Sequence, residues 1–543
     1  MTAIESAAQP LDVTHRVDNQ VPPLHGFDPL ACDPALVGAV RAFGSDDVVG
    51  SLSALAVEAG SEQAREHGRL ANEHPPVLRS HDRYGNRVDE VEFHPSWHWL
   101  MSRAVSHGLH AAPWAPDAGP DAHLRRAAAF MLWSQVEAGH GCPISMTYAA
   151  VPALRHSPEV AAVFEPGLIS RVYDPGLREP GAKAGLLAGM SMTEKQGGSD
   201  VRANTTTATP SADGTYSLIG HKWFTSAPMN DLFLTLAHAP GGLTCFVLPR
   251  VLPDGTRNAL RIQRLKDKLG NKSNASAELE YTGATGWRVG DEGRGVRTII
   301  EMVTMTRLDC VLGSTAGIRL ALSEAAWHAA NRSAFGTVLR AQPAMSSVLA
   351  DLAIESEAAT VLALKLASSL SNPLLRIALP AAKFYVCKRA PMVVAEALEC
   401  LGGNGYVEES GMPRLYREAP LMSIWEGSGN VTALDVLRAA AREPASVDAL
   451  FQELATTSGS DARLDAAVST LRAEVVDAEP ARARRIAELI TLCLQGSLLI
   501  RHGDAAVAEA FLSSRLDNPS GILGVLPRGL DTGRLVDRVT PAH

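Results

Sequence analysis

One block of the chain differs in character from everything around it, and this difference constrains the fold more than any other feature. Between residues 186 and 292 the sequence contains short runs rich in β-forming residues, among them YSLIGHKWFTS and LTCFVLPR. Turn-forming sequences such as SADG and LPDG separate these runs. Parallel strands need long crossover connections, usually helices, and no segment between the runs fits one. The block therefore predicts an antiparallel β-domain.

The segments on both sides of this block predict helices. HLRRAAAFMLWSQVEAGH (123–140) has apolar residues at helical spacing. From residue 293 the helical segments become long enough for a helical bundle, and PAAKFYVCKRAPMVVAEALECLGG is interrupted by Pro391. The expected fold is mainly α with a central antiparallel β-domain. It has four parts: an N-terminal helical domain (1–185), the β-domain (186–292), a helical bundle (293–440) and a C-terminal helical domain (441–543).

Composition excludes several classes of protein. No apolar run approaches the roughly 18 residues that cross a bilayer, and the N-terminus lacks the regions of a secretory signal. The seven cysteines form no CxxC pair, which favours free thiols in a reducing cytoplasm over disulfides or zinc. His94 and His98 are four residues apart, but Pro95 separates them and no carboxylate completes a metal set. We therefore expect a cytoplasmic protein without a metal or a membrane partner.

Two stretches near the β-domain have side chains suited to a ligand. In GMSMTEKQGGSDV (189–201), the Gly197–Gly198 turn and Ser199 could cradle an anion, or simply connect two strands. In GHKWFTSA (220–227), Trp223 and the hydroxyls that follow it could face a planar ring. A tryptophan on a strand is also a common core residue.

Two further stretches follow the long helices. In NRSAFGTVLRAQ (331–342), Arg332 and Phe335 are three residues apart and are expected to share a helix face. The arginine could bind a diphosphate or merely end a helix. LGGNGY (401–406) follows a predicted helix and does not complete GxGxxG, so we interpret it as a helix C-cap rather than a dinucleotide-binding loop.

The fifth stretch, SIWEGSGN (423–430), places Glu426 between Trp425 and a Gly-Ser-Gly turn. The apolar run after it predicts a helix with Ser428 or Asn430 as N-cap. A carboxylate just before a helix N-terminus is stabilised by about 0.3–1 kcal/mol. Glu426 could therefore be a proton-abstracting base or a partner of the helix.

In this order the five stretches resemble the acyl-CoA dehydrogenase flavoproteins. The family usually has proline where this chain has Lys195. GRLANEHPPVL, FHPSWHWL, RLKDKLGNKSNAS and PRLYREAPLMSIWEGSGN are similar to the AidB branch, which is associated with the bacterial adaptive response to DNA alkylation. The resemblance covers nearly the whole chain and is loosest in the last hundred residues.

The resemblance implies an FAD-dependent homotetramer, a dimer of dimers, that oxidises the CH–CH bond of an acyl thioester. Glu426 matches the family's catalytic base, and Ser226 and Arg307 match substrate-side positions; Arg307 could equally be a plain surface charge. The implied cofactor-binding residues are Met192, Thr193, Gly198, Ser199, Trp223, Phe224, Thr225, Ser226, Arg332, Phe335, Gln342, Ile424, Trp425, Gly427, Ser428 and Asn430.

The chemistry agrees with that assignment. Removing the weakly acidic α-proton of a thioester needs a desolvated carboxylate with a raised pKa and hydrogen bonds to the thioester oxygen. The transfer of the β-hydride to flavin N5 is the cofactor's chemistry. Some family members place the base just before an arginine on the long helix. Here Thr306 occupies that place, and a threonine cannot act as the base, so Glu426 has no obvious rival.

Two other functions stay open at this point. One is a flavin-containing, double-stranded-DNA-binding stress protein with weak or no dehydrogenase activity, and the other is a protein that sequesters acyl-CoA or lipid. Trp425 replaces the family's usual tyrosine and should narrow the cavity over the flavin. Residues 441–543 contain 11 arginines, no lysine and 14 acidic residues, with one compact basic cluster, ARARRIAEL. Such a cluster is more often a solvated helix face than a phosphate clamp.

Overall fold

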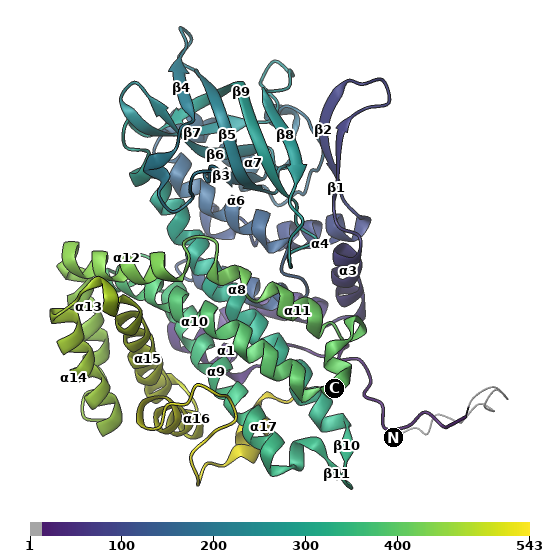
Figure 1. Cartoon of the computed structure of the whole chain (residues 1–543), viewed down its shortest axis with the longest axis vertical. Coiled ribbons are helices and arrows are strands. Elements are labelled where there is room, and N and C mark those ends of the chain that lie inside the picture. Colours follow the sequence, from purple (N-terminus) through teal and green to yellow (C-terminus); the bar gives the residue numbers. More distant parts are fainter. Residues whose placement is uncertain (1–13, 543) are drawn as a thin grey trace.

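The computed structural model describes residues 14–542 and confirms a mainly helical protein with a central β-domain (Figure 1). None of the helices in that range is long and apolar enough to cross a membrane. The N-terminal part contains the helices α1 (Pro34–Phe43), α2 (Asp46–Ala59), α3 (Glu62–Glu73), α4 (Pro95–Ser106), α5 (Ala122–Ser134), α6 (Gly141–Leu154) and α7 (Pro158–Leu168).

A β-hairpin interrupts these N-terminal helices, where the sequence predicted only helices and loops. Strands β1 (Val77–His81) and β2 (Arg87–Glu92) pair antiparallel. Two prolines directly after α3 prevent the helix from continuing. Asp82 then accepts hydrogen bonds from the backbone N–H groups of Tyr84 and Asn86, which fixes the turn.

The β-domain is a seven-stranded sheet that partly closes on itself. Its strands are β3 (Ala188–Ser191), β4 (Thr207–Pro210), β5 (Tyr216–Ser226), β6 (Leu232–Ala239), β7 (Gly242–Pro249), β8 (Leu260–Leu265) and β9 (Ser276–Val289). Their order is β3-β5-β4-β6-β7-β9-β8, with the further pairings β3–β6 and β5–β9. The prediction of a purely antiparallel domain was wrong in one respect, because β3 and β4 each pair parallel with β6.

Both faces of this sheet are covered. Leu218, Phe246 and Leu279 belong to a core enclosed by the strands themselves. Leu234 and Val247 belong to a second core, which the strands share with Ala149 of α6 and Met302 of the long helix that follows the sheet. The second core fixes the β-domain on the helices beneath it (Figure 1).

The helical bundle follows, with α8 (Gly295–Asn331), α9 (Pro343–Ala367), α10 (Leu374–Cys400), α11 (Met412–Glu418) and α12 (Gly429–Arg442). Helix α10 runs through Pro391, where the sequence suggested an interruption. A proline inside a helix costs about 3 kcal/mol, and packing of α10 against α8, α9, α12 and α15 (Ala483–His502) offsets that cost. Gly402 follows α10 with φ +60°, the left-handed conformation of a helix C-cap.

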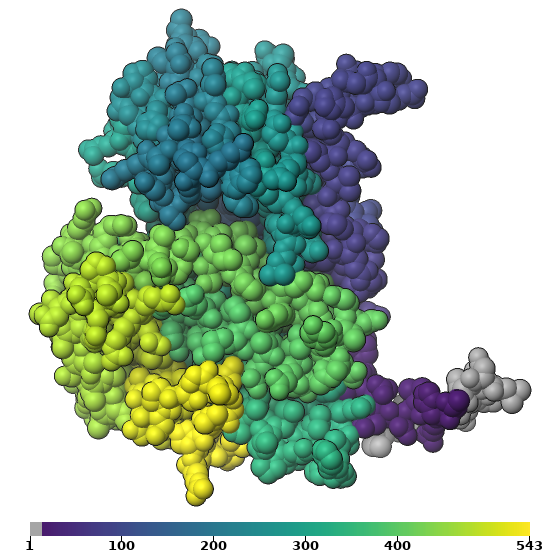
Figure 2. Space-filling model, viewed as in Figure 1, coloured from purple at the N-terminus to yellow at the C-terminus, as the bar shows by residue number. Residues whose placement is uncertain are grey.

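The C-terminal helices are α13 (Pro444–Ala455), α14 (Ala462–Val476), α15, α16 (Ala505–Phe511) and α17 (Thr532–Val539). They share one hydrophobic core with the bundle and the N-terminal helices, which joins Leu494 of α15 to Leu362 of α9 and Leu100 of α4. In Figure 2 these helices (yellow-green and yellow) and the β-domain (blue-teal) lie at opposite ends of one face, with the 400–440 segment (green) between them. The domain limits themselves stay a prediction.

The segment after α8 corrects one prediction. Arg332 and Phe335 do not share a helix face, because α8 ends at Asn331 and the chain enters a small hairpin of β10 (Ser333–Ala334) and β11 (Thr337–Val338). Phe335 and Gly336 form the turn with φ of 53° and 79°. Two consecutive left-handed residues cannot continue an α-helix, so the phenylalanine stands at the tip of a hairpin.

Candidate active site around Glu426

Glu426 lies in a short loop between the 3₁₀ helix Leu421–Ser423 and α12. Its backbone φ is +56°, and that of Gly427 is +102°. The left-handed region costs a residue with a side chain about 1–2 kcal/mol. Because glycine occupies the second position at no such cost, the strain is concentrated at the glutamate. Contacts from elsewhere in the fold must therefore hold this loop.

Two cations hold it from two different helices. The Nε of Arg307, on α8, donates to the main-chain carbonyl of Glu426 at 3.0 Å. Lys383, on α10 and 1% exposed, donates from Nζ to the carbonyl of Trp425 at 2.8 Å and to that of Gly427. Three successive carbonyls are thus fixed. Of the two interpretations of Arg307, a plain surface charge does not fit this position.

The carboxylate of Glu426 has its own partner. Thr306 Oγ1, at the position where other family members place the base, donates to Glu426 Oε2 at 2.7 Å. Burial raises the pKa of Glu426 above its ordinary value, although Thr306, Arg307 and Lys383 each act to lower it. A half-buried carboxylate with a raised pKa is a stronger base than a solvated one.

The motifs MTEKQGGSD and HKWFTS are joined by a buried ion pair that the sequence analysis did not anticipate. Glu194 and Lys222 meet at 2.8 Å with both side chains at 0% exposure. The backbone N–H groups and hydroxyls of Thr205 and Thr206 also donate to Glu194. The N–H of Lys195 donates to His221 at 3.0 Å, a bond that the family's usual proline could not make.

The turn at Gly197 and Gly198 is closely packed against Thr193. A Cβ at Gly198 would lie 2.7 Å from Thr193 Oγ1, so the position excludes a side chain unless Thr193 moves. Ser199, the next residue, is exposed, and Met192 and Thr193 are half-buried. The turn therefore presents backbone and a hydroxyl at the surface next to β5.

The residues of HKWFTS point in different directions. Phe224 is 48% exposed, and the Trp223 ring lies with its centroid 3.2 Å from Lys266 Nζ. Thr225 is buried, its hydroxyl is 2.6 Å from that of Ser191, and it is paired with Ser191 of β3 and Ala277 of β9. Ser226 Oγ is 3.4 Å from Ser276 Oγ.

The end of β5 and the base loop meet beside Cys142, at the start of α6. Burial, helped by the nearby carboxylate of Glu426, raises the pKa of this thiol to about 12, although Lys268 and Ser226 act to lower it. Met192 and Trp425 pack against the same hydrophobic core as Cys142. Residues of the first, second and fifth motifs are thus brought together within one chain.

The third motif is not brought to that place. Arg332, Phe335 and Gln342 lie at the β10–β11 hairpin, at the opposite end of the molecule from the β-domain (Figure 1). Arg332 donates to the carbonyl of Asn19, and Gln342 donates to that of Ala334 at 3.0 Å. Phe335 is 98% exposed. Within one chain these residues cannot contact a ligand bound at β5.

The remaining predicted residues lie around the start of α12. Ser428 is the N-cap residue, and Asn430 accepts a hydrogen bond from Arg484 of α15 at 3.3 Å. Ile424 is 63% exposed. The two other arginines of the basic cluster, Arg482 and Arg485, both bind Glu474.

Comparison with known proteins decides the family. Residues 19–175 match the AidB N-terminal domain, 189–284 the acyl-CoA dehydrogenase middle domain, and 293–441 the acyl-CoA dehydrogenase C-terminal domain. The chain is 45% identical over 517 residues to AidB of Escherichia coli (strain K12), covering 94% of this chain and 96% of that protein. The chain belongs to the AidB branch of the acyl-CoA dehydrogenase family.

Other relatives agree. Acyl-CoA dehydrogenase family member 11 of Caenorhabditis elegans is 32% identical over 490 residues, covering 82% of this chain and 79% of that protein. Among solved structures, Caenorhabditis elegans ACDH-11 in complex with C11-CoA superposes with a TM-score of 0.82 at 28% identity over 94% of this chain and 93% of that chain. Bd2924 in its apo-form gives 0.81 at 30% identity over 90% and 100%. This AidB-like chain is an acyl-CoA dehydrogenase-like oxidoreductase.

The family generally binds FAD, and the residues present here fit that group. The turn at Gly198 has no room for a side chain. Phe224, on strand β5 next to this turn, exposes an aromatic ring to solvent. Asn274 is 1% exposed, and neither of its side-chain polar atoms has a protein partner within ordinary hydrogen-bond geometry. This amide lies near Cys142, Ser226 and Lys268, where a bound group could satisfy it.

Proposed function

We propose that this protein binds FAD and oxidises a small acyl thioester, with Glu426 as the base. One observation supports this most directly: a half-buried carboxylate of raised pKa is held in a strained loop by Arg307 and Lys383, next to the strand end that contains Ser226. A helix partner or a solvated charge would not need this support.

The protein's part in the reaction is to place and accept a proton. Glu426 Oε takes the α-proton as the α-carbon–hydrogen bond breaks, and Thr306 orients the carboxylate by its hydrogen bond. Burial keeps water from competing and maintains the basicity of the group. FAD, when bound, supplies the acceptor for the hydride that leaves the β-carbon. Trp425, packed against the core, limits the width of the acyl group.

The same proposal assigns the cofactor contacts. Gly198 and Ser199 would hold the diphosphate through backbone N–H groups and a hydroxyl. Met192 and Thr193 would meet the pyrimidine edge. The ring system would lie along β5, and the start of α12 would close the site. The residues for these last two contacts are Trp223, Phe224, Thr225, Ser226, Ile424, Trp425, Gly427, Ser428 and Asn430.

We further propose that the active form is a homotetramer, a dimer of dimers. Arg332, Phe335 and Gln342 cannot reach the site of their own chain, and they would contact the adenine-containing half of the FAD bound by a neighbouring subunit. The nearly complete exposure of Phe335 supports this role, because a large aromatic side chain at a hairpin tip suits an intermolecular contact.

Replacing Phe335 by alanine should weaken FAD binding about tenfold or more, the loss expected for about 1.4 kcal/mol of aromatic contact. The chain itself should fold normally, because Phe335 packs so little within it. Titration of the apoprotein with FAD, followed by flavin fluorescence, measures the change. Tyr84, at the exposed tip of the β1–β2 hairpin, supplies the control: Tyr84→Ala should leave FAD affinity unchanged. Equal FAD affinity of Phe335→Ala and wild type would contradict the inter-subunit contact.

The overall proposal is tested by anaerobic titration with acyl-CoA thioesters of increasing chain length. The expected result is a yellow protein whose flavin absorbance bleaches with short or compact acyl groups and less with bulky ones, because Trp425 narrows the site. Protein that cannot be reconstituted with flavin would exclude the proposal. Tight acyl-CoA binding without bleaching would favour sequestration instead.

The cytoplasmic location and the link to alkylation stress belong to the same proposal and rest on the AidB relationship. DNA association gains less support from the structure. Two of the three arginines in the C-terminal cluster share Glu474, and the third, Arg484, contacts Asn430. Arginines with acidic partners release fewer counterions on binding DNA than free ones do.

A further inference from the structure

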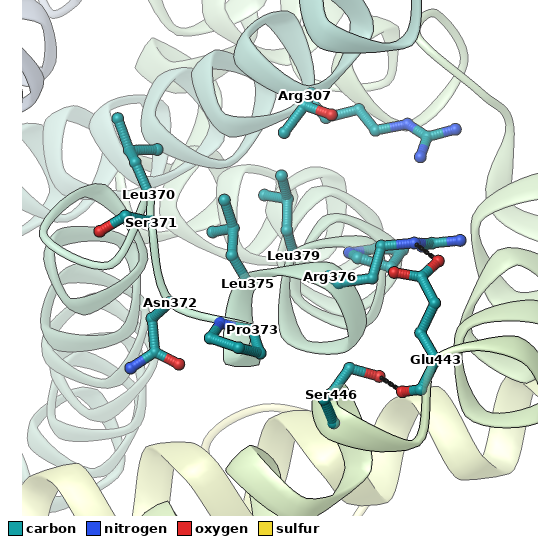
Figure 3. Close-up of a pocket in the computed structure, with 13 residues that line it drawn as sticks. Arg307, Leu370, Ser371, Asn372, Pro373, Leu375, Arg376, Leu379, Glu443 and Ser446 are labelled. Carbon is teal, nitrogen blue, oxygen red and sulfur yellow. Dashed lines mark hydrogen bonds and ion pairs between the residues drawn. The ribbon is translucent and has the colours of Figure 1, made fainter. Parts of the chain in front are cut away.

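A half-open cavity of about 430 Å³ lies beside Arg307, one of the two cations that hold the base loop (Figure 3). Leu370, Leu375 and Leu379 form its apolar side, and Arg307 and Arg376 extend along its charged side. Glu443, just after α12, closes the charged side through an ion pair with Arg376 at 2.7 Å. Arg307 thus lines this cavity and also contacts the loop of Glu426.

Asp435 of α12 lies between the two arginines. Its Oδ2 accepts from Arg307 Nη1 at 2.7 Å, and its Oδ1 accepts from Arg376 Nη2 at 3.2 Å. Arg438, one turn further along α12, reaches the same carboxylate at 3.1 Å from the solvent side. Asp435 is 5% exposed, and the Arg307 side chain is 12% exposed, so this contact is largely desolvated.

The positions of these charges determine where Arg307 can point. Its Nε holds the Glu426 carbonyl while its Nη1 holds Asp435, so the guanidinium is fixed at two points. If the bond to Asp435 were lost, the Arg307 side chain could move into the open cavity, where the Glu443 carboxylate lies. A guanidinium that turned toward Glu443 would leave the strained Glu426 backbone supported by Lys383 alone.

We propose that Asp435 is a positioning residue for the base: it fixes Arg307 against the Glu426 carbonyl and thereby holds the carboxylate over the reacting carbon. The inference rests on the proposed role of Glu426. The groups that face Glu426 are Thr306 and Arg307 of α8 and Lys383 of α10, with the thiols of Cys142 and Cys310 nearby. Asp435 acts on this set only through Arg307.

Asp435 stays ionised across the working range. Burial alone would raise its pKa, but Arg307 and Arg376 together hold the pKa below its ordinary value. Any pH dependence of the reaction between pH 5 and 9 therefore does not come from Asp435 itself. A changed pH profile in a variant of Asp435 reports on the environment of Glu426.

The test is Asp435→Asn, studied as FAD-loaded full-length protein with the acyl-CoA that bleaches wild type best. The rate constant of flavin reduction should fall about 10- to 100-fold, as expected when a reacting group is misplaced by less than about 1 Å. The concentration of acyl-CoA at half-saturation should change less than about threefold. The pH midpoint of the rate should move upward, because Glu426 loses the nearby charge of Arg307.

Glu443→Gln is the matched control, since it makes the same carboxylate-to-amide change at the exposed outer end of the network. It should keep the wild-type rate and midpoint. Asp435→Glu retains the charge, so it should keep the pH midpoint but lower the rate of flavin reduction. If Asp435→Asn does not fold, Asp435→Glu is studied in its place. Wild-type rate and midpoint in the Asp435 variant studied would overturn the positioning role and leave the base assignment intact. An active Glu426→Gln protein would instead overturn the base assignment.

Discussion

Glutamine at position 426 should slow substrate-driven flavin reduction by about 10²–10⁴-fold, the range expected when a general base is removed. Glutamine has nearly the same size as glutamate and can still accept the Thr306 hydrogen bond. The loop contacts from Arg307 and Lys383 go to main-chain carbonyls, so they also persist. The change therefore removes basicity without removing the local structure. Anaerobic stopped-flow mixing with acyl-CoA measures the rate of flavin reduction in the variant and the wild type.

The pH dependence follows from the same group. Burial raises the pKa of Glu426, and only the ionised form accepts a proton. The wild-type rate should therefore rise with pH through a midpoint above the ordinary value of a glutamate, and the residual rate of Glu426→Gln should lack that step. Glu66→Gln, at an exposed glutamate of α3 that pairs with Arg69, should behave like wild type. A Glu426→Gln protein that retained the rate and the pH step would require another base.

The second large effect concerns stability. Lys222→Met should lower the free energy of unfolding by about 3–5 kcal/mol, the cost of leaving one partner of a buried ion pair without the other. Methionine fills much of the volume of lysine, so the loss comes from the uncompensated charge of Glu194, whose side chain is 0% exposed. Urea unfolding followed by circular dichroism measures the loss. Because Glu194 anchors the turn before Gly198, FAD affinity should fall as well.

Lowering the pH should reduce the difference in free energy of unfolding between Lys222→Met and the wild type. In the wild type, burial tends to raise the pKa of Glu194, but Lys222, Thr205 and Thr206 hold it at about 2. Its folded pKa is therefore below its unfolded value of 4.5, and its contribution to stability is present above that pH and is lost toward pH 2. In Lys222→Met the carboxyl should instead prefer its neutral form, so the deficit relative to wild type should be largest at neutral pH.

The double variant Glu194→Gln/Lys222→Met is the informative control. It removes both charges, and an uncharged buried pair often costs little compared with a broken one. It should recover much of the stability that Lys222→Met loses. A double variant as unstable as the single one would mean that the packing of Lys222, and not the charge of Glu194, is decisive.

Local patterns were sufficient for the main elements of the fold. The β-forming runs became β5, β6, β7 and β9, and the segments of helical spacing became long helices. The errors arose where a few residues or tertiary packing overrode the local pattern. The β1–β2 hairpin depends on two prolines and one aspartate turn, the continuous α10 depends on its neighbours, and Phe335 left the helix because of the left-handed turn that it forms with Gly336.

The partners of the site were less accessible to sequence reasoning. Thr306 was considered only as a base that could not work, whereas the structure makes it the hydrogen-bond donor to the base. Lys383 and Asp435 gave no signal, because each acts across the bundle on residues far away in the chain. Glu194 and Lys222 lie in adjacent motifs, and opposite charges in two neighbouring β-strand motifs are the one pattern that could have suggested their pairing.

The positive φ at residue 426 also affects how the sequence can evolve. Glycine and asparagine tolerate this backbone conformation better than glutamate does, so selection for stability alone favours replacing the acid. Descendants that lost the chemistry should drift quickly to those residues, while descendants that kept it should resist the drift. The residue at position 426 in diverging lineages should therefore distinguish proteins that still catalyse the reaction from proteins that have lost it.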